Sequence, residues 1–586
     1  MSYKLNTSQA NAEKDPVWKA LARLLPLVKG EGPKLVVSFV AILVSAATAL
    51  ISPLIIGHTV DDFIATKDYN GVLLWSGILL AVYIVGLVSS YTQSRTMGGV
   101  ARRILFNLRN AIFTKLQELP VAFFNQNRSG DLISRINNDT DKLNQFFAQA
   151  LMQFLGNAVL IVGAGILLLT LNFRLGGASL LPAVLVLVVT QLIGGWVKRA
   201  NFKSLQTLGG LSGEIQESLA NFKVIVAFNR LDYFKAKFAE ANAGNYAASI
   251  RAGIANNIFI PLYGLAYNFG QLIVLAFGIY MISQGSLTSG LLIGFLLYVN
   301  NFYNPLRQLA SVWASLQLAL AALDRISEVM ALTSDMEVLP PTTVAKSGAV
   351  LEFDNVSFAY PDGKDVLSGI SFSLERGKTY ALVGPTGGGK TTTASLMARL
   401  YDPTAGAVLL DGRDIRTYPP EQRAQKIGFI LQEPFLFTGT VRDNIVYGNE
   451  GLAGVSDSQL TRLLADANLS SLLARFDQGL ETPVTSSGDS ISLGQRQLIA
   501  FIRAALRNPE LLILDEATAN IDTVTEQLLE EILAKLPAST TKVIIAHRLN
   551  TIDNADEIFF VNAGAVTRAG SMDDAVDMLL HGAMQS

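Results

Sequence analysis

Residues 379–400, TYALVGPTGGGKTTTASLMARL, place an apolar run, a glycine-rich turn and a helical pattern one after another. The apolar run Thr379–Val383 predicts a buried strand, and the segment after Thr391 predicts a helix. Between them, Gly384–Thr391 has the spacing of a phosphate-binding loop in its required strand–loop–helix context. Lys390 would reach the β and γ phosphate oxygens, and the Thr391 hydroxyl would bind Mg²⁺. The alternative is a glycine-rich turn without a ligand. The predicted nucleotide-binding residues of this segment are Gly384, Pro385, Thr386, Gly387, Gly388, Gly389, Lys390, Thr391 and Thr392.

Two further apolar runs end in residues suited to the same chemistry. The run 511–514 precedes Asp515 and Glu516. Asp515 would complete a Mg²⁺ site, and Glu516 would polarise the water that attacks the γ-phosphorus. The alternative is an acid that caps the next helix. A third run, 542–546, precedes His547, at the end of a predicted parallel strand where such folds bind ligands. The alternative is a structural histidine, which is the more usual role of a lone histidine after a strand.

The composition of the 586 residues excludes a purely soluble enzyme. Hydrophobic residues make up 50% and charged residues only 16%, and the mean hydropathy is +0.36, so much of the surface is expected to meet lipid. A net charge of −2 disfavours nucleic acid as a partner. Because there is no cysteine, disulfides and thiolate metal sites are excluded.

Six windows in the first half are free of Asp, Glu, Lys and Arg and are long enough to cross a bilayer. The connections after the second and fourth windows are rich in Lys and Arg, so they and both termini are predicted to be cytoplasmic. Their helical patterns predict extensions of the spans, and the alternative is separate helices on the membrane surface. The windows are Leu35–Val60, Gly71–Ser94, Leu151–Phe173, Leu175–Val197, one from Ala252 to about Ser283, and one from about Leu287 to Leu306.

The predicted fold class is an α-helical polytopic membrane domain of six transmembrane helices with long cytoplasmic extensions, followed by an α/β P-loop ATPase domain. The N-terminal segment includes an amphipathic elbow helix over residues 16–29. The predicted parts are a cytoplasmic N-terminal segment with the elbow helix (1–34), a transmembrane domain (35–330), a linker (331–348) and a nucleotide-binding domain (349–586).

With these motifs in order, nearly the whole chain resembles an ATP-binding cassette (ABC) exporter half-transporter of the multidrug or lipid type. The resemblance implies that Tyr360 in FAYP stacks on adenine and that Gln432 in LQEP contacts Mg²⁺ and senses the membrane domain. It implies that Asp522 communicates across a dimer and that His547 contacts the γ-phosphate. The cofactors implied are ATP and Mg²⁺.

The signature motif departs from the family pattern LSGGQ. This chain has Ile491-Ser492-Leu493-Gly494-Gln495, followed by a helix predicted from about Arg496. Ser492, Gly494 and Gln495 retain the groups that would meet the γ-phosphate in a partner domain. Leu493 replaces a glycine and is expected to weaken ATP contacts there. Because altered signatures occur in the family in one half of heterodimers, the resemblance favours a second, different half-transporter as partner over a homodimer.

The resemblance also implies how the chain works. ATP bound between two domains would close them, and hydrolysis would release them. Segments 123–131 and 218–228 would be the coupling helices. The expected function is ATP-driven export or flipping of an amphiphilic substrate across the cytoplasmic membrane, and the alternative is a nucleotide-gated channel or a regulatory half-subunit. Polar and aromatic residues of the last two spans suit such a substrate, but they could equally hold the helices together by hydrogen bonds.

Overall fold

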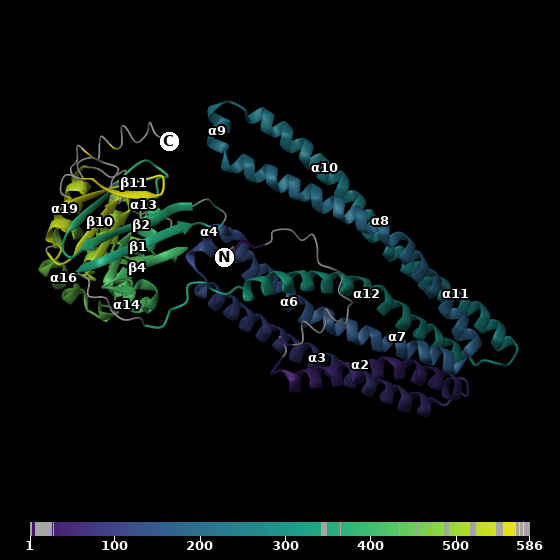
Figure 1. Cartoon of the computed structure of the whole chain (residues 1–586). Helices are drawn as coiled ribbons and strands as arrows, with labels where there is room; N and C mark the ends of the chain where they lie inside the picture. Colours follow the sequence, from purple (N-terminus) through teal and green to yellow (C-terminus); the bar gives the residue numbers. More distant parts are fainter. Residues whose placement is uncertain are drawn as a thin grey trace. The chain divides into compact units, whose positions relative to one another are not determined.

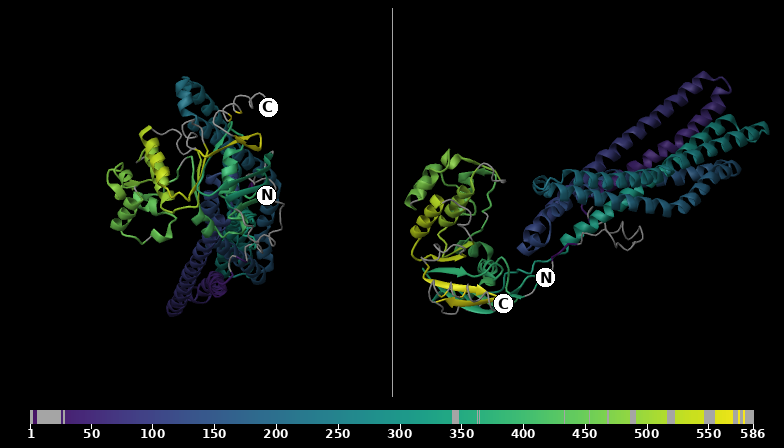
Figure 2. Two further views of the ribbon diagram at one scale, coloured as in Figure 1. Left: turned by 60° about the vertical axis from the view of Figure 1, so that its left-hand side comes forward. Right: turned by 90° about the horizontal axis from the view of Figure 1, so that it is seen from above.

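The chain forms two compact units, and the computed structural model describes each of them in detail (Figures 1 and 2). The sheet unit contains Met1–Leu5, Glu118–Arg128 and Leu332–Ser586, and the helical unit contains Asn6–Gln117 and Ser129–Ala331. The described residues are 3–5, 26, 29–341, 348–361, 363, 365–432, 434–452, 454–467, 469–485, 491–515, 523–545, 555–569, 574 and 578. Most of the predicted elbow helix, 16–29, lies outside them.

The helical unit consists of long helices that run roughly along one direction (Figures 1 and 2). Its helices are α2 (Gly32–His58), α3 (Tyr69–Glu118), α5 (Ser129–Ser134), α6 (Thr140–Gln145), α7 (Leu151–Leu171), α8 (Phe173–Ala220), α9 (Phe222–Ala227), α10 (Leu231–Asn257), α11 (Phe259–Ser283) and α12 (Ser289–Met330), with π-helical turns at Thr59–Ile64, Arg135–Asp139 and Phe146–Ala150. Because α3 and α8 continue for 50 and 48 residues, the basic connections extend the spans and are not separate surface helices.

Within the described residues, five continuous helical segments are long and apolar enough to cross a membrane. They contain the first five predicted spans: Gly32–Ile64, Tyr69–Glu118, Ser129–Leu171, Phe173–Ala220 and Leu231–Ser283. The sixth predicted span lies in α12, whose apolar run is interrupted by Asn300, Asn301 and Asn304. A helix with this many amides suits a bundle interior or a water-filled path better than a lipid contact.

Hydrogen bonds to backbone carbonyl groups tie α12 to its neighbours. The Tyr298 hydroxyl donates to Leu50 O at 2.6 Å, and the Asn301 amide donates to Ala49 O at 3.0 Å, both in α2. The Tyr303 hydroxyl donates to Ser179 O of α8 at 2.8 Å. For Tyr298 and Asn301, the structure therefore favours the alternative that these polar groups hold the bundle together.

A buried ion cluster joins the start of the third helical segment to the last turns of α12. The Arg135 side chain is 1% exposed. Its guanidinium lies 2.8 Å from Glu328 Oε2 and 3.0 Å from Asp131 Oδ2. Arg325 pairs with both Asp131 and Asp139. Because a buried cation without its partners is strongly destabilising, this cluster holds residues 131–139 and α12 together.

The described part of the sheet unit contains two large sheets, with the strand orders β2-β1-β4-β5 and β12-β11-β3-β10-β9-β6, and a two-stranded sheet of β7 and β8. In the six-stranded sheet, all neighbours except β11 and β12 pair in parallel. The strands are β1 (Ala349–Ala359), β2 (Asp365–Glu375), β3 (Thr379–Val383), β4 (Ala405–Leu410), β5 (Arg413–Asp414), β6 (Ile427–Ile430), β7 (Gly439–Thr440), β8 (Pro483–Val484), β9 (Leu511–Asp515), β10 (Thr541–Ile545), β11 (Glu557–Asn562) and β12 (Ala565–Ala569). The helices are α4 (Val121–Gln126), α13 (Lys390–Met397), α14 (Pro420–Lys426), α15 (Val441–Val446), α16 (Asp457–Asp466), α17 (Ser470–Leu473), α18 (Leu493–Ala505) and α19 (Thr523–Lys535).

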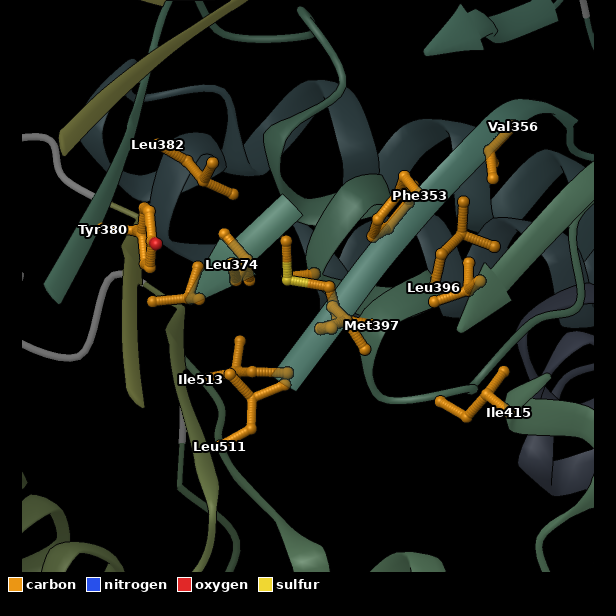
Figure 3. Packing of buried hydrophobic residues seen from close by; sticks show 14 of the residues in the cluster. Phe353, Val356, Leu374, Tyr380, Leu382, Leu396, Met397, Ile415, Leu511 and Ile513 are labelled. Carbon is orange, nitrogen blue, oxygen red and sulfur yellow. The ribbon is translucent and has the colours of Figure 1, made fainter. Parts of the chain in front are cut away.

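The strand β9 separates two hydrophobic cores because its side chains alternate between the two faces of the sheet. Leu511 and Ile513 pack with Phe353, Tyr380 and Met397 in the core beneath the β1–β2–β4 sheet (Figure 3). Leu512 and Leu514 pack into the other core, which is formed mainly by α15–α19. With both faces covered, the strand is held firmly, and it ends at Asp515.

Candidate functional site

The candidate site forms where the parallel strands β3, β10 and β9 end at one edge of the sheet. The register pairs Leu382 of β3 with Ile545 of β10, and Ile545 with Asp515 of β9. The glycine-rich loop 384–389 follows β3 directly, and α13 begins at Lys390. This is the edge at which open parallel sheets bind ligands.

The glycines of the loop are required by close backbone contacts. A Cβ atom on Gly384, whose φ is +146°, would lie 2.1 Å from the carbonyl oxygen of Val561 in β11. At Gly388 the same atom would lie 2.6 Å from that oxygen. Gly389, with φ +112°, forms the N-cap of α13. Only residues without a side chain fit here, and they bring the loop and the helix N-terminus together.

The Lys390 side chain folds back over the loop. It is 5% exposed, and its ammonium group donates to Gly384 O at 2.8 Å and to Pro385 O at 3.0 Å. A phosphate entering the loop would give this cation a charge-assisted partner in place of two neutral carbonyl groups.

Thr391, in the first turn of α13, places its hydroxyl near the carboxylate of Asp515 at the end of β9. The Thr391 hydroxyl lies 3.4 Å from Asp515 Oδ1, and the Asp515 side chain is 6% exposed. A hydroxyl and a carboxylate at this spacing are ligands of the kind that Mg²⁺ prefers, with phosphate oxygens and waters completing its shell.

A cavity of about 300 Å³ lies over the loop. Its lining combines the aromatic ring of Tyr360 with the glycine loop and the start of α13, and the Tyr360 hydroxyl hydrogen-bonds the Thr392 hydroxyl at 3.1 Å. The lining residues are Tyr360, Val366, Thr386, Gly387, Gly389, Lys390, Thr391 and Thr392. Of these, Val366 was not predicted, although its position just after the FAYP hairpin could have indicated it.

The pocket aromatic is connected to α4 through one further residue that the sequence did not single out. The ring of Tyr401 packs edge-on against Tyr360, with centroids 5.3 Å apart. The Tyr401 hydroxyl accepts a hydrogen bond of 2.7 Å from the Asn125 amide of α4. Burial raises the pKa of Tyr401, so the hydroxyl stays protonated at neutral pH. The first predicted coupling segment, 123–131, therefore contributes a residue that reaches the pocket lining through Tyr401.

The signature residues lie at the start of α18 and not in the lining of this cavity. Ser492 is the N-cap, its hydroxyl accepts from Gln495 N, and the Gln495 side chain accepts from Ser492 N. The helix begins at Leu493, so the prediction of a start near Arg496 was wrong by one turn. Leu493 is the first helical residue and packs against the α15–α19 core, so the backbone there does not require a glycine.

Of the remaining predicted site residues, Gln432 lies within the described residues, and three others do not. Gln432 is exposed, and its carbonyl oxygen accepts a 3.0 Å hydrogen bond from Gln497, a buried side chain that the sequence did not indicate. Glu516, Asp522 and His547 lie outside the described residues. They follow β9 and β10, the two strands that end at the site.

A strand–loop–helix phosphate site with a buried lysine and an acid on the next strand but one defines a P-loop nucleotide-binding protein, here joined to a helical membrane unit. Two family models match the chain: the ABC transporter transmembrane region over residues 35–306, and the ABC transporter model over residues 367–519. The ABC transporter ATP-binding protein YfiC of Bacillus subtilis is 35% identical over 553 residues, covering 92% of this chain and 89% of the relative.

Two relatives carry names that include a substrate. A multidrug resistance ABC transporter ATP-binding and permease protein of Lactococcus lactis is 30% identical over 561 residues, covering 95% of this chain and 94% of the relative. A fatty acid ABC transporter ATP-binding/permease protein of Mycobacterium tuberculosis is 31% identical over 504 residues, covering 86% of this chain and 79% of the relative. The chain belongs to the ABC transporter family. It is a multi-pass membrane protein that binds ATP, works as a dimer and couples ATP hydrolysis to export.

The close contact between the loop and β11 predicts that Gly384→Ala weakens ATP binding. The added methyl group must move away from Val561 O, and local strain of about 1–3 kcal/mol would lower the affinity about 5- to 150-fold. Gly363→Ala is a matched control near Tyr360, because its Cβ would make only an ordinary contact of 3.6 Å. Titration with a fluorescent ATP analogue measures both. Wild-type affinity in Gly384→Ala would contradict this account of the loop.

Proposed function

We propose that the protein exports an amphiphilic substrate by alternating access, with ATP closing two nucleotide domains and hydrolysis reopening them. The observation that carries this proposal is the contact series from the pocket to α4, through Tyr360, Tyr401 and Asn125. Leu119 and Pro120 connect α4 to α3, whose 50 residues span about 75 Å, far more than a bilayer. A displacement of α4 would thus be passed through this short connection to a helix long enough to cross the membrane.

Each site residue has a role in this proposal. Tyr360 stacks on adenine, the loop 384–389 binds the phosphates through its N–H groups, and Lys390 holds the β and γ oxygens. Glu516 acts as the general base, and His547 contacts the γ-phosphate. The signature residues Ser492, Gly494 and Gln495 face the nucleotide held by the partner chain, and Asp522 communicates across the dimer.

We propose Mg²⁺ as the second cofactor, held by Thr391, Gln432 and Asp515 together with phosphate oxygens. The short distance between the Thr391 hydroxyl and Asp515 supports this set. When bound, the ion would neutralise charge on the phosphates. Thr391 and Asp515 would hold the ion, and Lys390 would bind the β and γ phosphate oxygens.

We propose that the protein lies in the cytoplasmic membrane with both termini and the nucleotide-binding domain in the cytoplasm, as the basic connections predict. We retain the parts 1–34, 35–330, 331–348 and 349–586 as functional regions. The compact units divide the chain differently, since residues 3–5 and 118–128 group with the sheet unit. The contacts of Asn125 give a reason for this, because they place α4 on the nucleotide-binding domain.

The polar residues of α11 and α12 that are left exposed support an amphiphilic substrate. Asn268 and Asn304 are exposed, while Tyr267 and Tyr303 beside them pack against each other with centroids 6.4 Å apart. Amides next to aromatic rings offer contacts to both parts of an amphiphile. Relatives named for fatty acid and for multidrug resistance favour export over the alternative of a nucleotide-gated channel or regulatory half-subunit.

The assignment of Glu516 predicts that Glu516→Gln lowers ATP hydrolysis at least about 100-fold and leaves ATP binding within about threefold, because a general base contributes about 10²–10⁴ in rate. Glu530→Gln makes the same chemical change on an exposed position of α19 and should leave both unchanged. Phosphate release from the purified dimer in lipid measures the rate. Full activity in Glu516→Gln would show that the base is another residue.

We propose a heterodimer, supported by Leu493 in the signature. We expect that two differently tagged copies of this chain, expressed together in the source organism, are not recovered in one complex, and that each brings down a different half-transporter. Purification through one tag and detection of the other measures this. Recovery of both tags in equal amounts would show a homodimer.

A further inference from the structure

Three residues near the N-terminus belong to the sheet unit, although the chain from Asn6 to Gln117 belongs to the helical unit. Tyr3 is 2% exposed and Leu5 is 4% exposed, while Lys4 between them is exposed. This alternation is that of an extended segment with one face against the protein. We call residues 3–5 the N-terminal strap.

The strap is bound through its backbone by the last residue of α4 and the residue after it. Tyr3 N donates to Gln126 Oε1 at 2.8 Å, and Leu5 N donates to Asn127 Oδ1 at 2.9 Å. The Asn127 amide donates in return to Tyr3 O at 2.9 Å and to Phe123 O at 2.7 Å. Asn127 therefore connects the strap to the body of α4, and these bonds do not depend on the identity of the strap side chains.

The Tyr3 side chain connects the strap to a second segment. Asp335 N donates to the Tyr3 hydroxyl at 2.9 Å. Burial, together with a hydrogen bond to the Asp335 side chain, raises the pKa of Tyr3 to about 12, so the phenol stays neutral. A cavity of about 770 Å³ also borders Tyr3. The ring is buried, and its hydroxyl is fixed by the bond from Asp335 N.

The strap contacts lie close to the points where the chain passes from one unit to the other. The chain passes between the two units at residues 5/6, 117/118, 128/129 and 331/332. The strap joins Gln126 and Asn127, just before the third crossing, to Asp335, just after the fourth. It also fixes the end of α4 next to Asn125, the residue that contacts Tyr401.

We infer that the N-terminal strap is a positioning element for energy coupling: it fixes the end of α4 to the segment around Asp335, so that both exits to the helical unit follow movements of the nucleotide site together. This inference rests on the proposed function. Tyr3 and Asn127 lie outside the lining of the nucleotide cavity, so their loss should uncouple the protein without abolishing its ATPase activity.

The test compares transport with hydrolysis in proteoliposomes of the purified dimer, with ethidium and a fluorescent palmitate analogue as probes. In Tyr3→Ala and Asn127→Ala, we expect the number of probe molecules moved per ATP hydrolysed to fall at least fivefold, with ATP hydrolysis retained within about twofold. Tyr3→Phe keeps the ring and the backbone bonds but removes the hydroxyl that bonds Asp335, so the ratio should fall, by less than in Tyr3→Ala. Lys4→Ala is the matched control on the exposed face of the strap and should behave as wild type.

An unchanged ratio in Tyr3→Ala and Asn127→Ala, or an equal loss in Lys4→Ala, would overturn the inference. If wild type moves neither probe in an ATP-dependent way, that result counts against the proposed function and not against the strap. Hydrogen exchange then decides: residues 118–128 should exchange at least tenfold faster in Tyr3→Ala than in wild type. Equal protection in both would show that the strap does not position α4.

Discussion

The close approach between the glycine loop and β11 is the contact on which the site depends. The carbonyl group of Val561 leaves no room for a side chain at Gly384 or Gly388, so the backbone itself forms the wall of the cavity. Lys390 is buried over this wall and bonded to carbonyl groups of the loop. Each of these features prepares the loop for an anion, and a phosphate would replace weaker neutral contacts with charged ones. The glycine loop therefore favours ATP binding, and its contact with β11 holds it rigidly in place.

The other side of the pocket is where movement can leave the nucleotide site. Tyr360 packs against Tyr401, and Tyr401 is hydrogen-bonded to Asn125 in α4. The N-terminal strap is hydrogen-bonded to the next two residues, Gln126 and Asn127. In the helical unit, the Arg135 cluster joins the segment after α4 to the end of α12. Thus each unit contains a set of polar contacts that joins the chain near residues 126–139 to the chain near residues 325–335. The strap contacts and the Arg135 cluster both consist of hydrogen bonds and ion pairs, whose geometry is more specific than that of apolar packing.

The local features of this fold could be predicted from the sequence, because they depend on periodicity and short motifs. The strand β3 has its predicted bounds and the glycine loop follows it as predicted, whereas α3, α8 and α12 continue more than 20 residues past the predicted ends of their spans. The start of α18 was missed by one turn, although Ser492 and Gln495 have the spacing of a capping box. The asparagines of α12 were recognised as polar, but which of them bind neighbouring helices depends on tertiary packing. The pairs Asn125–Tyr401, Arg135–Glu328 and Tyr3–Gln126 each join residues more than 100 positions apart, so no local pattern could indicate them.

The central claim is that nucleotide held by the glycine loop supplies the energy for moving substrate through the helical unit. ATP-dependent uptake of a fluorescent probe into inside-out vesicles, compared between wild type and Lys390→Ala, tests it most directly. Lys378→Ala is the control, since Lys378 pairs with Glu557 at 3.1 Å and lies outside the pocket lining. The account predicts that uptake is lost in Lys390→Ala and retained in Lys378→Ala. Equal uptake by wild type and Lys390→Ala would contradict it.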